Sequence, residues 1–273
     1  MQYGFIGCGN MGGAVARALC HTTDAKEVLL ANRTMSKAKD LAQELGCAYG
    51  TNEDVASTCE YIFLCVKPQM MKDMLEGIAD ILQRREKGSF VLVSMAAGLT
   101  MSKLLDMVQG DYPIIRIMPN TPVLLGKGMI QYCHQNVNNT QLDTWLKAMA
   151  LCGVLDEVSE KDMDAASSVS GCGPAFVYAF IEALADGGVA CGLPRQKAMT
   201  YAAQMVFGSA SMVLETGKHP GQLKDEVCSP GGSTIQGVRT LEEHGFRGAV
   251  MDSVIAAYEK TKDLGKSVKH YAM

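Results

Sequence analysis

The sequence lacks the spacing patterns by which cysteine and histidine build metal sites or disulfide frameworks. Its ten cysteines are dispersed, and no two of them form a Cys-x-x-Cys pair. The five histidines are equally scattered, and none lies one helical turn from another histidine or a cysteine. We therefore expect reduced, mostly buried thiols and no metal ion.

The sequence also has no block of basic residues and no long apolar run. The net charge is −4, with 25 lysines and arginines spread along the chain, which argues against a nucleic-acid or anionic-membrane partner. No apolar stretch reaches the roughly 18 residues that span a bilayer, and the first residues carry no basic signal region. We therefore expect a cytoplasmic chain.

What is present is the composition of a packed globular protein. Apolar residues make up 48% of the 273 and charged residues 20%, which excludes a disordered protein. In the first half, apolar runs alternate with helical periodicity. The expected strands are 2–6, 27–31, 61–66, 90–94 and 113–118, and the expected helices are 13–20, 36–45, 70–82 and 101–108.

This alternation predicts an α/β fold, with one parallel sheet covered by helices on both faces, for a doubly wound (Rossmann) domain over residues 1–157. The remaining residues, 158–273, carry almost no strand signal. Their long helical runs are 174–190, 194–216 and 246–264, with a proline at the start of the first two. We therefore expect a second, all-helical domain.

A glycine motif joins the first expected strand to the first helix. Residues 7–12 have the pattern Gly-x-Gly-x-x-Gly, in which the first glycine makes the turn, the second admits a pyrophosphate and the third packs the helix on the strand. The second strand ends in Asn32, Arg33 and Thr34, without a carboxylate. Arg33 can pair with a 2′-phosphate, which favours NADPH over NADH as the cofactor.

A second glycine loop, Ser-Pro-Gly-Gly-Ser-Thr at 229–234, stands before a helical run at 235–243. Backbone N–H groups freed by glycine, followed by hydroxyls at a helix start, form a cradle for a carboxylate or phosphate. Composition alone leaves this interpretation and a plain surface turn equally open.

Five segments, ordered along nearly the whole chain, resemble one family. They are residues 5–12 (FIGCGNMG), 63–68 (FLCVKP), 118–122 (MPNTP), 170–175 (SGCGPA) and 223–242 (LKDEVCSPGGSTIQGVRTLE). The chain resembles the pyrroline-5-carboxylate reductases, which reduce a cyclic imine to L-proline with NADPH or NADH as the last step of proline biosynthesis.

The resemblance implies a set of site residues. The substrate would be bound by Ser229, Gly231, Gly232, Ser233 and Thr234, with Thr234 as the catalytic residue. The cofactor would be bound by Ile6, Gly7, Cys8, Gly9, Asn10, Met11, Asn32, Arg33, Thr34, Asn52, Cys65, Val66, Lys67, Pro68, Ala96, Ala97, Asn120 and Glu160. The sequence departs from the family at Cys172, where serine or threonine is expected, and at Glu226, where some members have a cofactor-contacting asparagine.

Three other functions remain open. A β-hydroxyacid dehydrogenase would carry a lysine early in the first helix after the domain junction, and residues 170–190 contain none. A metal-dependent reductase of the ketol-acid type could use Glu182 and Asp186, which share one helical face. A catalytically silent NADP sensor would not need the loop at 229–234.

The helical domain predicts a homodimer. Residues 174–216 carry only five charges, so their helices are too apolar to stand exposed. A two-fold interface in which helices of two protomers interleave would cover them. The family resemblance implies the same dimer and its further assembly into a ring.

Overall fold

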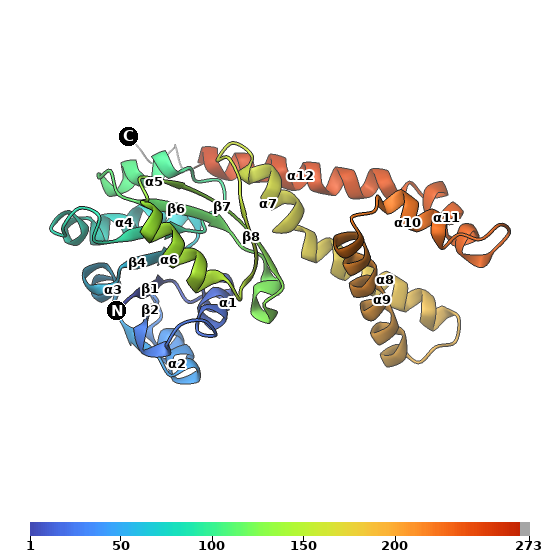
Figure 1. Cartoon of the computed structure of the whole chain (residues 1–273), viewed down its shortest axis with the longest axis horizontal. Coiled ribbons are helices and arrows are strands. Elements are labelled where there is room, and N and C mark those ends of the chain that lie inside the picture. Colours follow the sequence, from blue (N-terminus) through green and yellow to red (C-terminus); the bar gives the residue numbers. More distant parts are fainter. Residues whose placement is uncertain (268–273) are drawn as a thin grey trace. The chain divides into compact units, whose positions relative to one another are not determined.

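The computed structural model describes residues 1–267, and its first part is an eight-stranded sheet with helices on both faces (Figure 1). The strands are β1 (Tyr3–Ile6), β2 (Val28–Ala31), β3 (Ala48–Gly50), β4 (Tyr61–Leu64), β5 (Val91–Ser94), β6 (Ile114–Met118), β7 (Gly128–Gln135) and β8 (Gly153–Glu157). Their order across the sheet is β3-β2-β1-β4-β5-β6-β7-β8. This order, with a reversal between β1 and β4, is that of a doubly wound dinucleotide-binding fold.

The sheet is not wholly parallel, which corrects the prediction. Strands β1 to β6 are parallel, but β7 pairs antiparallel with β6, Ile114 facing Gln135, and β8 then runs parallel to β7. The connection between β6 and β7 contains one short 3-10 helix, η2 (Thr121–Leu125). This connection is too short for the helical crossover that a parallel pairing requires, so the chain turns back.

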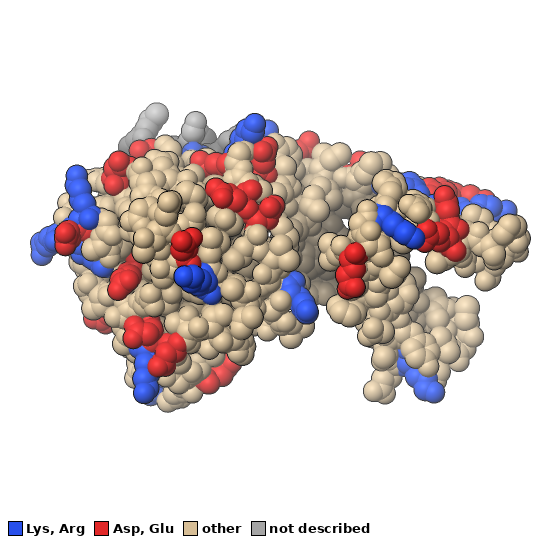
Figure 2. Space-filling model, viewed as in Figure 1, with Lys and Arg blue, Asp and Glu red and all other residues tan. Residues whose placement is uncertain are grey.

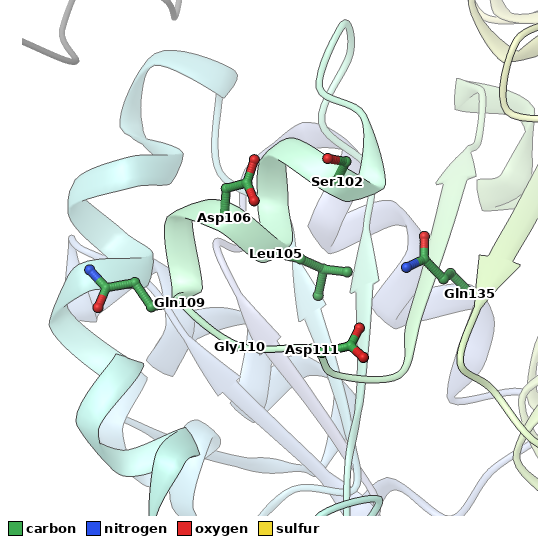
Figure 3. A pocket seen from close by; sticks show the side chains of 7 residues that line it. All are labelled: Ser102, Leu105, Asp106, Gln109, Gly110, Asp111 and Gln135. Carbon is green, nitrogen blue, oxygen red and sulfur yellow. The ribbon is translucent and has the colours of Figure 1, made fainter.

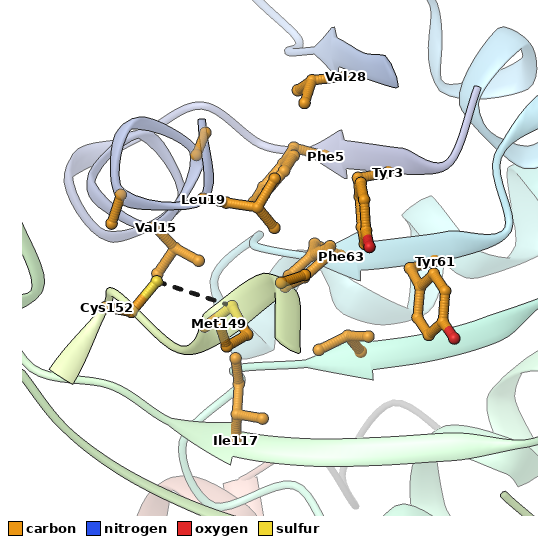
Figure 4. Packing of buried hydrophobic residues seen from close by; sticks show 14 of the residues in the cluster. Tyr3, Phe5, Val15, Leu19, Val28, Tyr61, Phe63, Ile117, Met149 and Cys152 are labelled. Atoms are coloured by element: carbon orange, nitrogen blue, oxygen red, sulfur yellow. Dashed lines mark hydrogen bonds between the residues drawn. The ribbon is translucent and has the colours of Figure 1, made fainter. Parts of the chain in front are cut away.

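Helices cover both faces of the sheet. On one face lie α1 (Asn10–Leu19), α2 (Met35–Leu45) and α6 (Asn139–Met149), and on the other α3 (Asn52–Thr58), α4 (Pro68–Gln83), α5 (Met101–Val108) and α7 (Met163–Ser170). In the first of these two cores, the rings of Phe5 and Phe63 stack at 4.4 Å, and Tyr3 stacks on Tyr61 at 5.4 Å (Figure 4). These aromatic pairs fix the register of β1 against β4.

The remaining chain is helical, as predicted. Its helices are α8 (Gly173–Ala190), α9 (Arg195–Thr216), α10 (Pro220–Glu226), α11 (Ser233–Glu243) and α12 (Phe246–Ser267). Helices α8 and α9 pack against each other through Ala185, Ala198 and Ala202, the small residues at their shared core. Their outward apolar side chains stay exposed, among them Tyr201, Phe207, Met212 and Leu214.

The structure divides the chain at different points from the predicted domains 1–157 and 158–273. One compact unit holds Met1–Cys172 together with the chain from Ala257, and the other holds Gly173–Ala256. Helix α7 belongs to the first unit because it packs on β7 and buries Met163 in the core of the sheet. The end of α12 belongs there too, since Gly265 lies directly against Gly98.

All ten cysteines are free thiols, and their environments differ. Burial raises the pKa of Cys8 and of Cys152 to about 12, so both thiols are protonated at neutral pH. Cys191, in the turn between α8 and α9, is the exposed one of the ten, all of which lie within the described residues.

Candidate cofactor and substrate sites

The glycine motif lies at the reversal point of the sheet, and each of its three glycines has a different constraint. Gly7 has φ +106°, and a Cβ there would lie 2.9 Å from the Cys65 carbonyl oxygen after β4. At Gly12 a Cβ would lie 2.2 Å from the Gly7 carbonyl oxygen. Around Gly9, by contrast, the space is open to 4 Å. The turn therefore has room for a ligand at Gly9 only, at the N-terminus of α1.

The N-terminus of α1 is suited to an anion. Gly9 is the N-cap and contributes no side-chain cap, so the first N–H groups of α1 have no side-chain acceptor. No acidic residue stands in the first turn of the helix. Burial and the neighbouring Cys8 hold the pKa of the Cys65 thiol well above its ordinary value, so the adjoining loop carries no thiolate charge that would repel phosphate.

Asn32 connects the glycine turn to the end of β2. Its Oδ1 accepts a hydrogen bond from the Cys8 N–H at 3.1 Å, and its Nδ2 donates to the Thr34 carbonyl at 3.0 Å. Both polar ends of the predicted cofactor residue are thus engaged by the protein. Asn32 therefore holds the glycine turn at Cys8 in a fixed position relative to the loop that follows β2.

That following loop presents exposed cationic and hydroxyl groups. Arg33 is exposed and forms no ion pair within the part of the chain that the structure describes. Thr34, the N-cap of α2, makes no side-chain cap, and the first turn of α2 contains no acidic residue. Arg33 and the start of α2 therefore have no acidic neighbour in the first turn of the helix, and a contact with a 2′-phosphate stays a prediction.

The other predicted cofactor residues occupy neighbouring loop positions. Cys65, Val66 and Lys67 follow β4, with Pro68 as the first residue of α4, and Ala96 and Ala97 follow β5. Asn52 opens α3, after the edge strand β3. Since these strands are parallel, the loops meet at one edge of the sheet with the glycine turn. The fold thus brings together the residues that the sequence placed around the dinucleotide.

Two of the predicted cofactor residues have side chains that are already engaged within the protein. Asn120 is buried; its Oδ1 accepts from the Met129 N–H at 2.9 Å and its Nδ2 donates to the Ser170 carbonyl at 3.0 Å. Glu160 accepts a hydrogen bond from the Met101 N–H at 2.6 Å and lies 3.5 Å from Arg116. Sequence reasoning did not single out Arg116, although an arginine inside an apolar strand is a recognisable signal.

The loop at 229–234 forms a helix N-terminus with few internal partners. Gly231 has φ +69°, and the Gly232 N–H donates to the Ser229 carbonyl at 3.0 Å. Gly232 is the N-cap of α11 and provides no side-chain acceptor for its first turn. The Thr234 side chain is exposed and has no hydrogen-bond partner within residues 1–267. Within the described residues, the start of α11 and the Thr234 hydroxyl therefore lack side-chain partners, and the anion cradle stays a prediction.

The carboxylate of Glu226, the departure noted above, already has two partners within the protein. Its carboxylate pairs with Lys218 Nζ at 2.8 Å and accepts from Gln222 at 3.1 Å. The Lys218 contact lowers its pKa from the ordinary value. Glu226 thus stabilises helix α10 and the segment before it rather than presenting a free carboxylate.

Other surface features do not form a competing site. A hollow of about 520 Å³ near α5 is lined by residues that include Asp106, Asp111 and Gln135 (Figure 3). Asp111 precedes β6, so this hollow lies at the amino edge of the parallel strands, whereas the glycine turn lies at their carboxyl edge. Acidic and basic side chains are interspersed over the face shown in Figure 2. Residues 1–267 contain no group of three histidine, cysteine or acidic side chains placed to hold a metal ion.

Comparison with known proteins decides the family. A family described as pyrroline-5-carboxylate reductase dimerisation matches residues 160–264, and one described as NADP oxidoreductase, coenzyme F420-dependent, matches residues 2–98. Pyrroline-5-carboxylate reductase of Escherichia coli is 41% identical, over 97% of this chain and 99% of that protein. The chain belongs to the pyrroline-5-carboxylate reductase family. The resemblance predicted from its motifs is confirmed.

Further relatives and solved structures agree. The Arabidopsis thaliana pyrroline-5-carboxylate reductase is 38% identical, over 97% of this chain and 96% of that protein. The crystal structure of the Plasmodium falciparum pyrroline carboxylate reductase, with NADP bound, has a TM-score of 0.88 at 36% identity, covering 97% of this chain and 98% of that one. The predicted fold, a Rossmann domain followed by a helical dimerisation domain, is likewise confirmed.

The ketol-acid alternative is supported only at the level of the fold. A ketol-acid reductoisomerase from an uncultured archaeon has a TM-score of 0.64 at 14% identity, covering 99% of this chain and 84% of that one. The two carboxylates proposed for such a site, Glu182 and Asp186, are both exposed, and Asp186 forms an ion pair with Arg195. Neither observation favours that chemistry.

One helical run corrects an expectation. The stretch Met163–Ala190, which comprises α7 and α8, is long and apolar enough to cross a membrane by length and composition alone, whereas no such stretch was expected from the sequence. A helix whose apolar surface is covered by a partner subunit can have the same length and apolar composition as a membrane-spanning helix. In this chain the stretch lies within residues 160–264, which match the dimerisation family.

Proposed function

We propose that this chain reduces L-1-pyrroline-5-carboxylate to L-proline, with NADPH as the preferred hydride donor and NADH as the alternative. Membership of the reductase family carries this proposal. The glycine turn supports it, because the open space at Gly9 and the close packing at Gly7 and Gly12 fit a bound pyrophosphate. The test is oxidation of NADPH on addition of the imine, and no turnover with NADPH or NADH would overturn it.

The reaction requires positioning more than acid–base chemistry. When bound, the cofactor would supply a hydride for the imine carbon, and a proton on the ring nitrogen would complete the amine. The protein must therefore hold the substrate carboxylate and orient the ring. We assign the carboxylate to the N–H groups at the start of α11, with the Ser229 hydroxyl beside them, because these donors have no side-chain cap.

Thr234 is proposed to hydrogen-bond the ring nitrogen. A hydroxyl is too weak an acid to serve as the proton source, so its role is to orient the nitrogen and relay a proton from water. Its exposed position beside the N-cap Gly232 places the hydroxyl at the same helix end as the carboxylate donors.

Thr234→Ala is expected to lower kcat/KM by about ten- to a hundredfold, because it removes one hydrogen bond to a nitrogen that carries charge. NADPH affinity should be retained. Steady-state kinetics with the imine, alongside a cofactor titration, measure both quantities. Thr240→Ala, on an exposed position of the same helix α11, is the matched control. Wild-type kinetics for Thr234→Ala would remove this residue from the mechanism.

Arg33→Ala is expected to weaken NADPH binding by about ten- to a hundredfold and to leave NADH binding nearly unchanged, since only NADPH carries the 2′-phosphate. Titration with each cofactor measures the two dissociation constants. Arg239→Ala, another exposed arginine, controls for the loss of one positive charge. An equal loss for both cofactors would contradict the assignment of Arg33.

A homodimer is proposed as the active form, and assembly of dimers into a ring as a further step. The match to a dimerisation family and the exposed apolar side chains of α9 support the dimer. We also propose a cytoplasmic location, which the ten free thiols support because disulfides are rare in reducing compartments.

A further inference from the structure

A buried cation lies on β6, close to the end of the sheet that carries the cofactor loops. The Arg116 side chain is 1% exposed. Its Nη2 donates to Asp164 Oδ1 at 2.7 Å, and its Nη1 lies 3.5 Å from Glu160 Oε1. An arginine stays charged even when buried, so it needs such counter-charges to remain in the core of the sheet.

One of these two carboxylates has a second partner on α5. Glu160 Oε1 accepts a hydrogen bond at 2.6 Å from the N–H of Met101, the first residue of the helix. The N–H groups at a helix start lack intrahelical acceptors, and a negative charge there is favoured by the helix dipole. The N-cap Thr100 accepts from the Lys103 N–H at 3.3 Å, and Glu160 adds a second, charged acceptor for the start of α5 from a distant segment of the chain. Arg116 orients this carboxylate.

The start of α5 carries the loop that follows β5. This loop contains Ala96, which is 1% exposed, and Ala97, both proposed above to lie against the cofactor. Within the loop, the Ala96 N–H donates to Ser94 Oγ at 3.3 Å and the Leu99 N–H donates to the Ala96 carbonyl at 3.4 Å. Both are long, whereas the bond to Glu160 is short and charge-assisted. The Glu160 contact is thus the firmest polar anchor of these three.

We propose that Arg116 is a positioning residue for hydride transfer, acting through Glu160 and the N-terminus of α5 on the loop at 95–100. The proposal rests on the proposed function for the reaction itself. It differs from the role that the family resemblance gives Glu160, because the carboxylate acts on the loop rather than on the cofactor. The competing explanation is that Arg116 only stabilises the fold.

Two variants weaken the contact between Arg116 and Glu160, which leads to α5. A third weakens the ion pair between Arg116 and Asp164. Glu160→Gln keeps an acceptor for the Met101 N–H but loses the attraction to Arg116, and Arg116→Lys keeps the charge but loses the fork geometry. Asp164→Asn weakens the ion pair of Arg116 without touching the contact to α5, so it is the matched control for a purely structural role.

The first readout is the single-turnover rate of hydride transfer. We expect Glu160→Gln and Arg116→Lys to lower this rate about tenfold, with the NADPH dissociation constant within about threefold of wild type, because the phosphate contacts lie elsewhere. Asp164→Asn should stay within about twofold on both quantities. A rate loss for Asp164→Asn as large as that for Glu160→Gln, or an unchanged rate for Glu160→Gln, would overturn the proposal.

The second readout does not depend on the reaction. Hydrogen exchange at the Met101 amide should accelerate about tenfold or more in Glu160→Gln and Arg116→Lys, and stay unchanged in Asp164→Asn. Thermal unfolding identifies any variant that fails to fold, in which case Glu160→Gln, the mildest change, decides. If wild type does not turn over the imine, the proposed function fails, while this exchange pattern still tests the anchoring of α5. Equal exchange in all variants would refute the anchor.

Discussion

Gly12→Ala is expected to weaken NADPH binding about a hundredfold or more. The new methyl group would lie 2.2 Å from the Gly7 carbonyl oxygen and 2.7 Å from Cys65 Cβ, well inside van der Waals contact. Helix α1 must then move off β1 and β4, and a displacement near 1 Å at a binding turn costs about two orders of magnitude. Titration with NADPH measures the loss.

The control for Gly12→Ala is Gly77→Ala in α4, where a Cβ meets no atom within 4 Å. That change should leave NADPH binding unaltered and raise stability slightly, since alanine favours the helix. If Gly12→Ala binds NADPH as tightly as Gly77→Ala, helix α1 does not set the position of the pyrophosphate.

Phe207→Glu is expected to raise the dimer dissociation constant about a hundredfold or more and to lower activity per chain when the protein is dilute. Phe207 lies on α9 with 58% of its surface exposed in the single chain. A carboxylate at that position would be buried without a partner in the proposed interface. Sedimentation and activity, measured over the same range of protein concentration, test the link between assembly and turnover.

Gln83→Glu, at the exposed end of α4 in the first unit, adds the same charge away from α9 and should change neither assembly nor activity. A fully active monomer of Phe207→Glu would show that one chain suffices. It would also leave the apolar surface of α9 without a function.

Local signals were enough to predict the part of the fold that holds the dinucleotide. The glycine motif, the apolar runs and the helix caps act within about ten residues, so strands β1, β2, β4 and β5 and helices α1, α2 and α4 could be predicted directly, whereas α3 was not predicted. Strand β3 has only three residues, and β7 mixes polar and apolar residues, so neither stands out. Helix α6 was not predicted either, although the capping box of Asn138 and Gln141 is a signal for its start.

The candidate site was predictable in its positions but not in the state of its side chains. The sequence can place Asn120 and Glu160 near the cofactor edge. It cannot show that their polar atoms are taken by Met129, Ser170 or Met101, because those partners lie far away along the chain or on other elements. The role of Arg116 was missed for the same reason. The two carboxylates that face it come from a segment more than forty residues away, as the 48-residue separation from Asp164 shows.

The exposed thiol of Cys191 is a natural site for attaching a spectroscopic label. Burial holds Cys8 and Cys152 in the protonated, unreactive form, while Cys191 stands in solvent at the turn between α8 and α9. A fluorophore or spin label carried by a maleimide would therefore attach first at this turn, without any engineered cysteine. The tip of the α8–α9 hairpin can then be followed spectroscopically in the unmodified sequence while subunits associate and ligands bind.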